Sequence, residues 1–264
     1  MTSAALAKTA EALVADGKGI LAADESSPTI KKRFDSIKID STEENRRDYR
    51  DMLFSTPEAG NYISGVILYD ETLRQKAADG TPLVERLTKA GMIPGIKVDS
   101  GAKPLAGHPD ETVTEGLDGL RARLADYAKL GAKFTKWRGV YRIGEDIPSP
   151  GCVTANAHAL ARYAALAQEA GLVPIVEPEV LMDGDHDIDI CEEVTEEVLR
   201  SVYNELALQN VWLEGTLLKP NMVVSGQDCP EQAGVQEVAE RTVRCLKRTV
   251  PAAVPGIVFL SGGQ

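Results

Sequence analysis

Short apolar runs recur along the chain at fairly regular intervals. They begin near Gly19, Ser64, Ile93, Phe134, Val173, Gly215 and Ile257. The runs at residues 173–176 and 257–260 are apolar without alternation, which is typical of strands that are covered on both faces. The pattern therefore predicts seven buried strands.

Amphipathic segments fill most of the intervals between these runs. Apolar residues keep helical spacing in four segments, at residues 117–127, 160–166, 198–206 and 235–246. Gly131 and Gly171 follow the first two, where glycine often ends a helix. Ser41 and Glu44 predict a capping box for an earlier helix. Strands that alternate with helices imply parallel pairing and right-handed crossovers.

The alternation predicts an α/β fold in a single domain over residues 1–264, with no linker or break in composition. A doubly wound sheet can hold seven strands, whereas a closed (β/α)8 TIM barrel needs eight. The chain stops directly after the seventh run. We expect an incomplete TIM barrel that lacks the eighth strand and the C-terminal tail.

Composition and charge indicate which partners and which cellular location to expect for the protein. The net charge of −11 argues against a nucleic acid or an acidic membrane surface as the main partner. The four cysteines are far apart and suggest neither zinc nor a disulfide framework. No apolar run approaches the length of a membrane span, and the N-terminus lacks the pattern of a secretion signal. We expect a cytoplasmic protein.

Lys219 follows a short apolar run and is followed by Pro220, which ends the strand. A lysine at a strand end is usually exposed, and its burial costs free energy unless it is paired or neutral. A neutral amine is the nucleophile that forms a Schiff base with a ketone or aldehyde.

Charged residues recur at the ends of the other predicted strands. They are Asp24, Lys97, Asp99, Lys136, Arg138, Glu177 and Glu179. Six of them form pairs two residues apart, and such pairs share one face of a strand. Any one pair could be a solvated edge or a structural salt bridge, but the recurrence favours a common site.

These residue types suit Schiff-base chemistry. Lys136 near Lys219 would favour the neutral amine through like-charge repulsion. Glu177 could act as acid and base during dehydration of the carbinolamine, and Asp24 could take a hydroxyl proton to start carbon–carbon cleavage.

Two segments could hold phosphates. Ser261 and Gly262 belong to a Ser-Gly-Gly turn whose backbone N–H groups could cradle one phosphate, although the turn alone is a weak signal. Ser26, Thr29 and Arg33 could hold a second, or could simply begin a polar helix. Two phosphate sites around a lysine would suit a bisphosphorylated sugar.

These motifs resemble class I fructose-1,6-bisphosphate aldolase. The matching segments run in the family's order through nearly the whole chain: residues 17–26 (GKGILAADES), 42–47 (TEENRR), 95–99 (GIKVD), 136–138 (KWR), 173–179 (VPIVEPE), 214–222 (EGTLLKPNM) and 259–264 (FLSGGQ). The resemblance implies reversible cleavage of fructose 1,6-bisphosphate to dihydroxyacetone phosphate and glyceraldehyde 3-phosphate, in glycolysis and gluconeogenesis. It also implies a phosphorylated sugar as the partner, a homotetramer and no metal or other cofactor.

The resemblance also assigns roles. By the family pattern Lys219 forms the Schiff base and Glu177 is the main acid and base, assisted by Asp24, Lys136 and Glu179. The implied substrate contacts are Lys97 and Arg138, Ser26, Thr29 and Arg33 near the 6-phosphate, and Ser261 and Gly262 at the 1-phosphate.

Two departures and three rivals remain. Thr29 stands where many members have serine, and the family's eighth strand and mobile tail are missing, so we expect a truncated chain with reduced activity or none.

The rivals are a Schiff-base aldolase for another sugar phosphate, an inactive fragment that only binds proteins, and a metal-dependent aldolase. The last would need His186 and its acidic loop as a cation site, which we consider the weaker interpretation.

Overall fold

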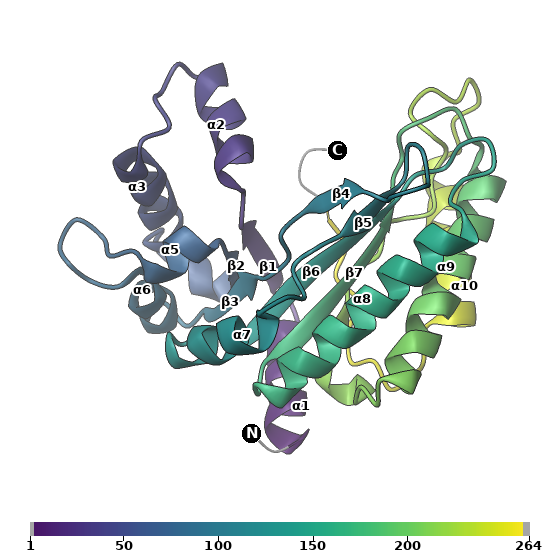
Figure 1. The fold of residues 1–264 in the computed structure, drawn as a ribbon. Coiled ribbons are helices and arrows are strands. Elements are labelled where there is room, and N and C mark those ends of the chain that lie inside the picture. The colour runs from purple at the N-terminus through teal and green to yellow at the C-terminus, as the bar shows by residue number, and fades with distance from the viewer. Residues whose placement is uncertain (1–2, 261–264) are drawn as a thin grey trace.

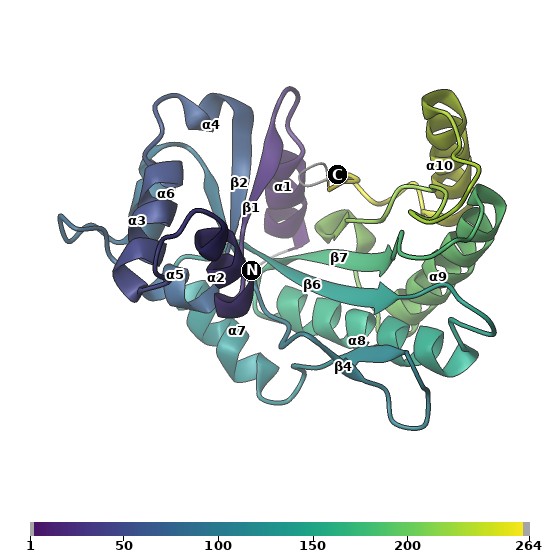
Figure 2. The same cartoon turned by 90° about the horizontal axis from the view of Figure 1, so that it is seen from above.

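The sheet at the centre of the protein is parallel and curled (Figures 1 and 2). The structure is a computed structural model and describes residues 3–260. Six strands pair in the order β1 (Gly19–Ala23), β2 (Ile63–Leu68), β3 (Ile93–Lys97), β6 (Phe134–Tyr141), β7 (Val173–Val180) and β8 (Leu217–Leu218). A curled parallel sheet with helices outside is the arrangement of a TIM barrel, and it excludes the flat doubly wound alternative.

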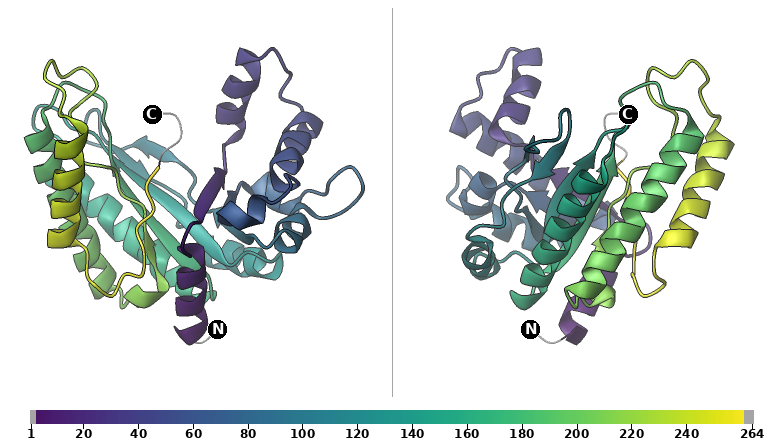
Figure 3. Two further views of the ribbon diagram at one scale, coloured as in Figure 1. Left: turned by 180° about the vertical axis from the view of Figure 1, so that it is seen from behind. Right: turned by 45° about the vertical axis from the view of Figure 1, so that its right-hand side comes forward.

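The seventh predicted strand is a short segment beside β8. Ile257 pairs in parallel with Leu218, and the backbone N–H of Val258 donates to the carbonyl of Leu218 at 2.9 Å. In Figure 3 this segment, in yellow, leaves the lower end of α10 and rises through the molecule. Residues 3–260 thus contain the seven parallel segments that the apolar runs predicted.

Helices surround the sheet. The helices are α1 (Ser3–Leu13), α2 (Ser27–Ser36), α3 (Glu43–Phe54), α4 (Ala59–Tyr62), α5 (Asp70–Arg74), α6 (Leu83–Lys89), α7 (Leu120–Lys129), α8 (Pro150–Glu169), α9 (Ile188–Leu208) and α10 (Val235–Thr249), with a 3-10 turn η1 (Leu213–Gly215). The four amphipathic segments correspond to α7, α8, α9 and α10. None of the helices within residues 3–260 is long and apolar enough to cross a bilayer.

The predicted capping box at Ser41 is wrong by one residue. Thr42 is the N-cap of α3, and its hydroxyl accepts a hydrogen bond from the backbone N–H of Asn45 at 3.1 Å. The carbonyl of Ser41 instead accepts from Arg46 at 2.6 Å. Both bonds join residues within five positions of one another, so the start of the helix is set by local contacts.

The N-terminal end of the sheet is closed by an apolar cluster. α1 contributes Leu6 and Leu13, which pack with Phe134 from β6. Gly95 on β3 makes room for that ring, because a Cβ placed there would lie 2.3 Å from Phe134. The N-terminal ends of the strands are therefore covered by apolar side chains, and the charged side chains lie at the opposite, C-terminal ends.

A hairpin that the apolar pattern did not predict lies over α8. It pairs β4 (Ala102–Pro104) with β5 (Thr112–Thr114) in antiparallel register. The side chain of Asn156 on α8 anchors it, accepting from the N–H of Thr114 at 3.1 Å and donating to the carbonyl of Thr112 at 2.8 Å. This hairpin leads the chain from the end of β3 toward α7.

Candidate active site

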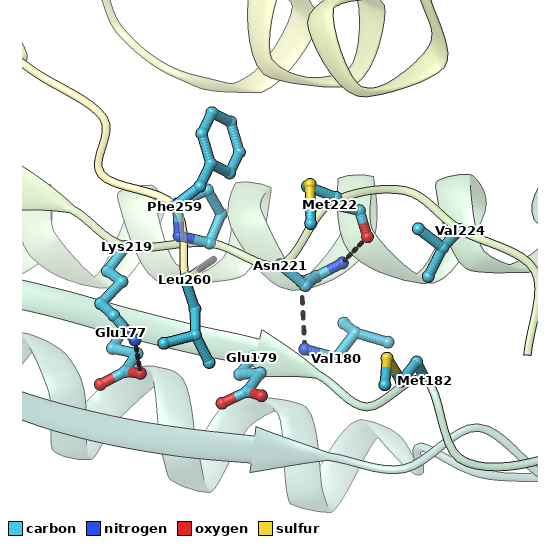
Figure 4. Close-up of a pocket in the computed structure, with 11 residues that line it drawn as sticks. Glu177, Glu179, Val180, Met182, Lys219, Asn221, Met222, Val224, Phe259 and Leu260 are labelled. Carbon is cyan, nitrogen blue, oxygen red and sulfur yellow. Dashed lines mark hydrogen bonds and ion pairs between the residues drawn. The ribbon is translucent and has the colours of Figure 1, made fainter. Parts of the chain in front are cut away.

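Lys219 lies where the sequence predicted it, directly after the buried strand β8. Its backbone N–H donates to the carbonyl of Val176 at 2.8 Å, which continues the pairing with β7. The side chain points inward, and its ammonium group contacts the carboxylate of Glu177 directly (Figure 4). The lysine is therefore paired, as its burial requires.

Lys136 on β6 completes a group of four. Its Nζ lies 3.0 Å from Asp24 and 3.1 Å from Glu177. Burial on its own would lower the pKa of Lys136, but the carboxylates of Glu177, Asp24 and Asp99 outweigh it, so that the pKa is raised. Lys136 is therefore a fixed cation at neutral pH, and it shares the Glu177 carboxylate with Lys219.

The remaining predicted pairs lie beside this group. The ammonium of Lys97 is 3.3 Å from Asp99, and the guanidinium of Arg138 contacts Glu179 directly. Asp99 also accepts from the backbone N–H of Arg138 at 3.3 Å. The pairs on β6 and β7 thus lie on one face of the sheet, as the i,i+2 spacing predicts, and Asp99 joins them from the residues that follow β3.

A small pocket opens next to Lys219. Glu177 and Glu179 line it together with Asn221, and the seventh parallel segment adds Phe259 and Leu260. The Leu260 side chain reaches toward the carboxylates, whereas the Phe259 ring points away from them (Figure 4). The pocket offers an uncharged wall opposite the carboxylates.

Sequence reasoning missed the role of Asn221. Its side-chain oxygen accepts from the N–H of Val180 at 3.1 Å, and its amide donates to the Thr195 hydroxyl at 3.0 Å and the Met222 carbonyl at 3.0 Å. These bonds tie the turn after Lys219 to β7 and α9. The motif Lys-Pro-Asn was the available signal, because asparagine side chains commonly bond to nearby backbone in turns.

The residues predicted near a phosphate lie on α2, with Ser26 and Thr29 at its start and Arg33 in its last turn. The hydroxyls of Ser26 and Thr29 are 3.0 Å apart. Arg33 contacts Glu25 at 2.6 Å while 61% of its side chain stays exposed. Within the described residues none of the three contacts the group around Lys219. Ser261 and Gly262 lie outside the described residues.

His186 does not form part of a cation site within residues 3–260. Only 6% of it is exposed, and neither ring nitrogen has a hydrogen-bond partner there. That part of the chain also contains no group of three or more His, Cys, Asp or Glu side chains that could hold a metal ion.

Comparison with known proteins gives one consistent result. The family model "Fructose-bisphosphate aldolase class-I" matches residues 5–264. A probable fructose-bisphosphate aldolase class 1 from Xanthomonas campestris is 66% identical over 98% of this chain and 78% of that protein. The fructose-bisphosphate aldolase of Drosophila melanogaster is 56% identical over 98% of this chain and 72% of that protein.

A solved structure agrees in fold. The fructose-bisphosphate aldolase of Plasmodium falciparum, in a complex with TRAP and a small-molecule inhibitor, superposes with a TM-score of 0.97 at 52% identity. The match covers 99% of this chain and 76% of that one. It confirms the predicted barrel class, and the family match confirms the resemblance of the motifs. The chain belongs to the class I fructose-bisphosphate aldolase family.

Proposed function

We propose that this chain is a lyase that reversibly cleaves fructose 1,6-bisphosphate to dihydroxyacetone phosphate and glyceraldehyde 3-phosphate, with Lys219 as the Schiff-base nucleophile. The observation that carries the proposal is the contact of the Lys219 amine with the Glu177 carboxylate, beside the buried cation of Lys136. The names of the family and of the relatives support the same substrate.

The contact with Glu177 gives the nucleophile a proton acceptor. When the Lys219 proton passes to Glu177, the neutral amine attacks the ketone carbon of the sugar. A proton then moves from the attached nitrogen to the former carbonyl oxygen, which gives the carbinolamine. Glu177 then donates a proton to the carbinolamine hydroxyl, which leaves as water, and an iminium bond to Lys219 remains. No metal ion is needed, because the iminium nitrogen is the electron sink.

Asp24 is assigned the next step. Its carboxylate removes the proton from the C4 hydroxyl, and the C3–C4 bond then breaks. The electron pair of that bond moves toward the iminium nitrogen. Glyceraldehyde 3-phosphate leaves, and an enamine remains on Lys219. Protonation of the enamine at C3 and addition of water release dihydroxyacetone phosphate. Lys136 holds both carboxylates in place throughout.

The other predicted residues are assigned to assistance and substrate binding. Glu179 assists proton transfer. The substrate contacts are Lys97 and Arg138 near the reacting carbons, Ser26, Thr29 and Arg33 at the 6-phosphate, and Ser261 and Gly262 at the 1-phosphate. The exposed guanidinium of Arg33 and the paired hydroxyls at the start of α2 support the 6-phosphate assignment.

The proposal includes a homotetramer that works in glycolysis and gluconeogenesis in the cytoplasm. Light scattering on the purified protein checks the assembly, since a tetramer would have four times the chain mass of 28.4 kDa. A monomeric mass would remove that part of the proposal and leave the chemistry untouched.

Borohydride trapping tests the chemistry. The protein is incubated with fructose 1,6-bisphosphate and reduced, and the modified peptide is identified by mass spectrometry. We expect covalent modification at Lys219 that disappears in Lys219→Arg and persists in the control Lys133→Arg. Absence of trapping, or trapping at another lysine, would contradict the proposal. It would then favour the interpretation of the chain as a binding protein.

A further inference from the structure

Arg50 is a charged side chain that the proposed mechanism does not use. It lies on α3 and is completely buried. Its Nη2 donates a hydrogen bond to the backbone carbonyl of Glu25 at 2.8 Å. The carboxylates of Glu25 and Glu71 flank it at 3.8 and 3.7 Å. Within residues 3–260 its Nε and Nη1 have no hydrogen-bond partner.

Burial of the Arg50 charge is not explained by a gain in stability alone. Burial lowers the pKa of Arg50 from its ordinary value, although Glu25 and Glu71 oppose that shift. A buried guanidinium with unsatisfied donors costs free energy, and an apolar side chain of similar volume is often as stable in such a place. The one strong bond that Arg50 makes, to the Glu25 carbonyl, is therefore the feature that needs an explanation.

The Glu25 peptide directly follows Asp24. Pairing of β1 with β2 ends at Ala23, so the sheet ladder no longer holds the backbone at this point. The carboxylate of Asp24 nevertheless reaches Lys136 at 3.0 Å. The Arg50 bond fixes the carbonyl one residue further along, and α3 is itself held by Arg46, whose Nε donates to Glu71 at 2.8 Å.

We propose that Arg50 is a positioning residue for the cleavage step. It holds the Glu25 peptide so that the Asp24 carboxylate points at Lys136 and at the substrate hydroxyl. The inference rests on the proposed function, in which Asp24 acts after the Schiff base has formed. Arg50 should therefore affect carbon–carbon cleavage and leave Schiff-base formation alone.

Two variants test this separation. Arg50→Lys keeps the charge without the fork of nitrogens, and Arg50→Met keeps the volume without the charge. We expect either one to lower kcat for cleavage by about tenfold to a hundredfold, the effect of a small misplacement of a catalytic group. The fraction of protein that borohydride traps with dihydroxyacetone phosphate should stay within twofold of the wild-type fraction. Arg47→Lys is the control, because Arg47 lies on the same helix but pairs with Glu44 and Asp48, away from Glu25, and should retain kcat.

A double-mutant cycle with Asp24→Asn distinguishes positioning from general damage. If Arg50 acts through Asp24, Arg50→Lys should change the residual cleavage rate of Asp24→Asn by less than twofold. Equal losses in both backgrounds, a folded Arg50→Met with wild-type kcat, or failure of both Arg50 variants to fold by near-ultraviolet circular dichroism would overturn the inference. Failure of the wild-type protein to be trapped would instead remove the proposed function itself.

Discussion

The ammonium group of Lys219 contacts the carboxylate of Glu177 directly, although the two residues are 42 positions apart in the chain. The cause is register: Leu218 on β8 pairs with Val176 on β7, so the residues that follow each of them leave neighbouring parallel strands side by side. Side chains that leave adjacent strands at the same level point to the same face. The apolar runs predicted the two strands, and the register between them brings the two side chains into contact.

Glu177→Gln tests the consequence of that contact. Glutamine keeps the size and hydrogen-bonding capacity but cannot take the proton from Lys219. We expect kcat to fall by about 10²- to 10⁴-fold, the usual contribution of a general acid or base. A coupled assay of triose phosphate release measures it. Glu169→Gln, at an exposed pair with Arg121, is the control and should keep full turnover. A Glu177 variant with wild-type kcat would show that the proton goes elsewhere.

Asn221→Ala tests the anchor of the turn after Lys219. The change removes one acceptor and two donated bonds, and it leaves the N–H of Val180 without its partner. We expect a loss of about 1–3 kcal/mol in the free energy of unfolding, the cost of unsatisfied polar groups. Urea titration measures it. Asn61→Ala, at an exposed position, should change the midpoint little. Equal midpoints for the two variants would contradict the anchoring role.

The strand ends could be predicted from the sequence because strands buried on both faces have a strong apolar signal. Even β8, which is only two residues long, was recognisable because Pro220 ends it immediately. The hairpin of β4 and β5 gave no such signal, since Ala102–Pro104 is exposed along its whole length. Its pairing depends on bonds to α8, which no local pattern contains.

The burial of Arg50 likewise could not be predicted from a local sequence pattern. Arg50 lies in a strongly charged segment, residues 43–51, that resembles a solvated helix face. In the folded chain it is buried against Glu25, which follows β1, and Glu71 on α5, and both are distant in sequence. Conversely, the charged pairs on β6 and β7 could be predicted together, because alternation along a strand is a local property.

Gly95→Ala tests the close packing under the site. The added methyl would lie 2.3 Å from the Phe134 ring, so that the ring or the strand must move. We expect a loss of about 1–3 kcal/mol in unfolding free energy, as for other overpacked cores. Gly19→Ala is the matched control, because a Cβ there meets no atom within 4 Å.

A second substitution makes the Gly95 test specific. Phe134→Leu removes part of the ring that the new methyl would strike, so Gly95→Ala should cost less in that background than in the wild-type chain. Thermal melts of the four proteins complete the cycle. Strictly additive losses would mean that the steric explanation is wrong.

The buried imidazole of His186 should make the free energy of unfolding depend on pH. Burial lowers the pKa of its imidazole from the ordinary value near 6.5, although Asp185 and Asp187 oppose the shift. Between the lowered folded-state pKa and that ordinary value, the unfolded chain then binds a proton more readily than the folded one. The contribution of His186 to stability is complete above about pH 6.5, and it is lost as the pH falls toward the lowered folded-state pKa.

His186→Gln removes that titration. We expect the free energy of unfolding of the wild-type protein to fall more between pH 7.5 and 5.5 than that of the variant. The limit is about 1.4 kcal/mol for each pH unit below the ordinary pKa. His158→Gln is the control, since that ring is half exposed beside Glu205. If the wild-type protein and His186→Gln lost equal stability on acidification, the buried imidazole would have to be protonated in the folded state. The loop around it would then need a hydrogen-bond acceptor for each ring nitrogen, which the described residues do not provide.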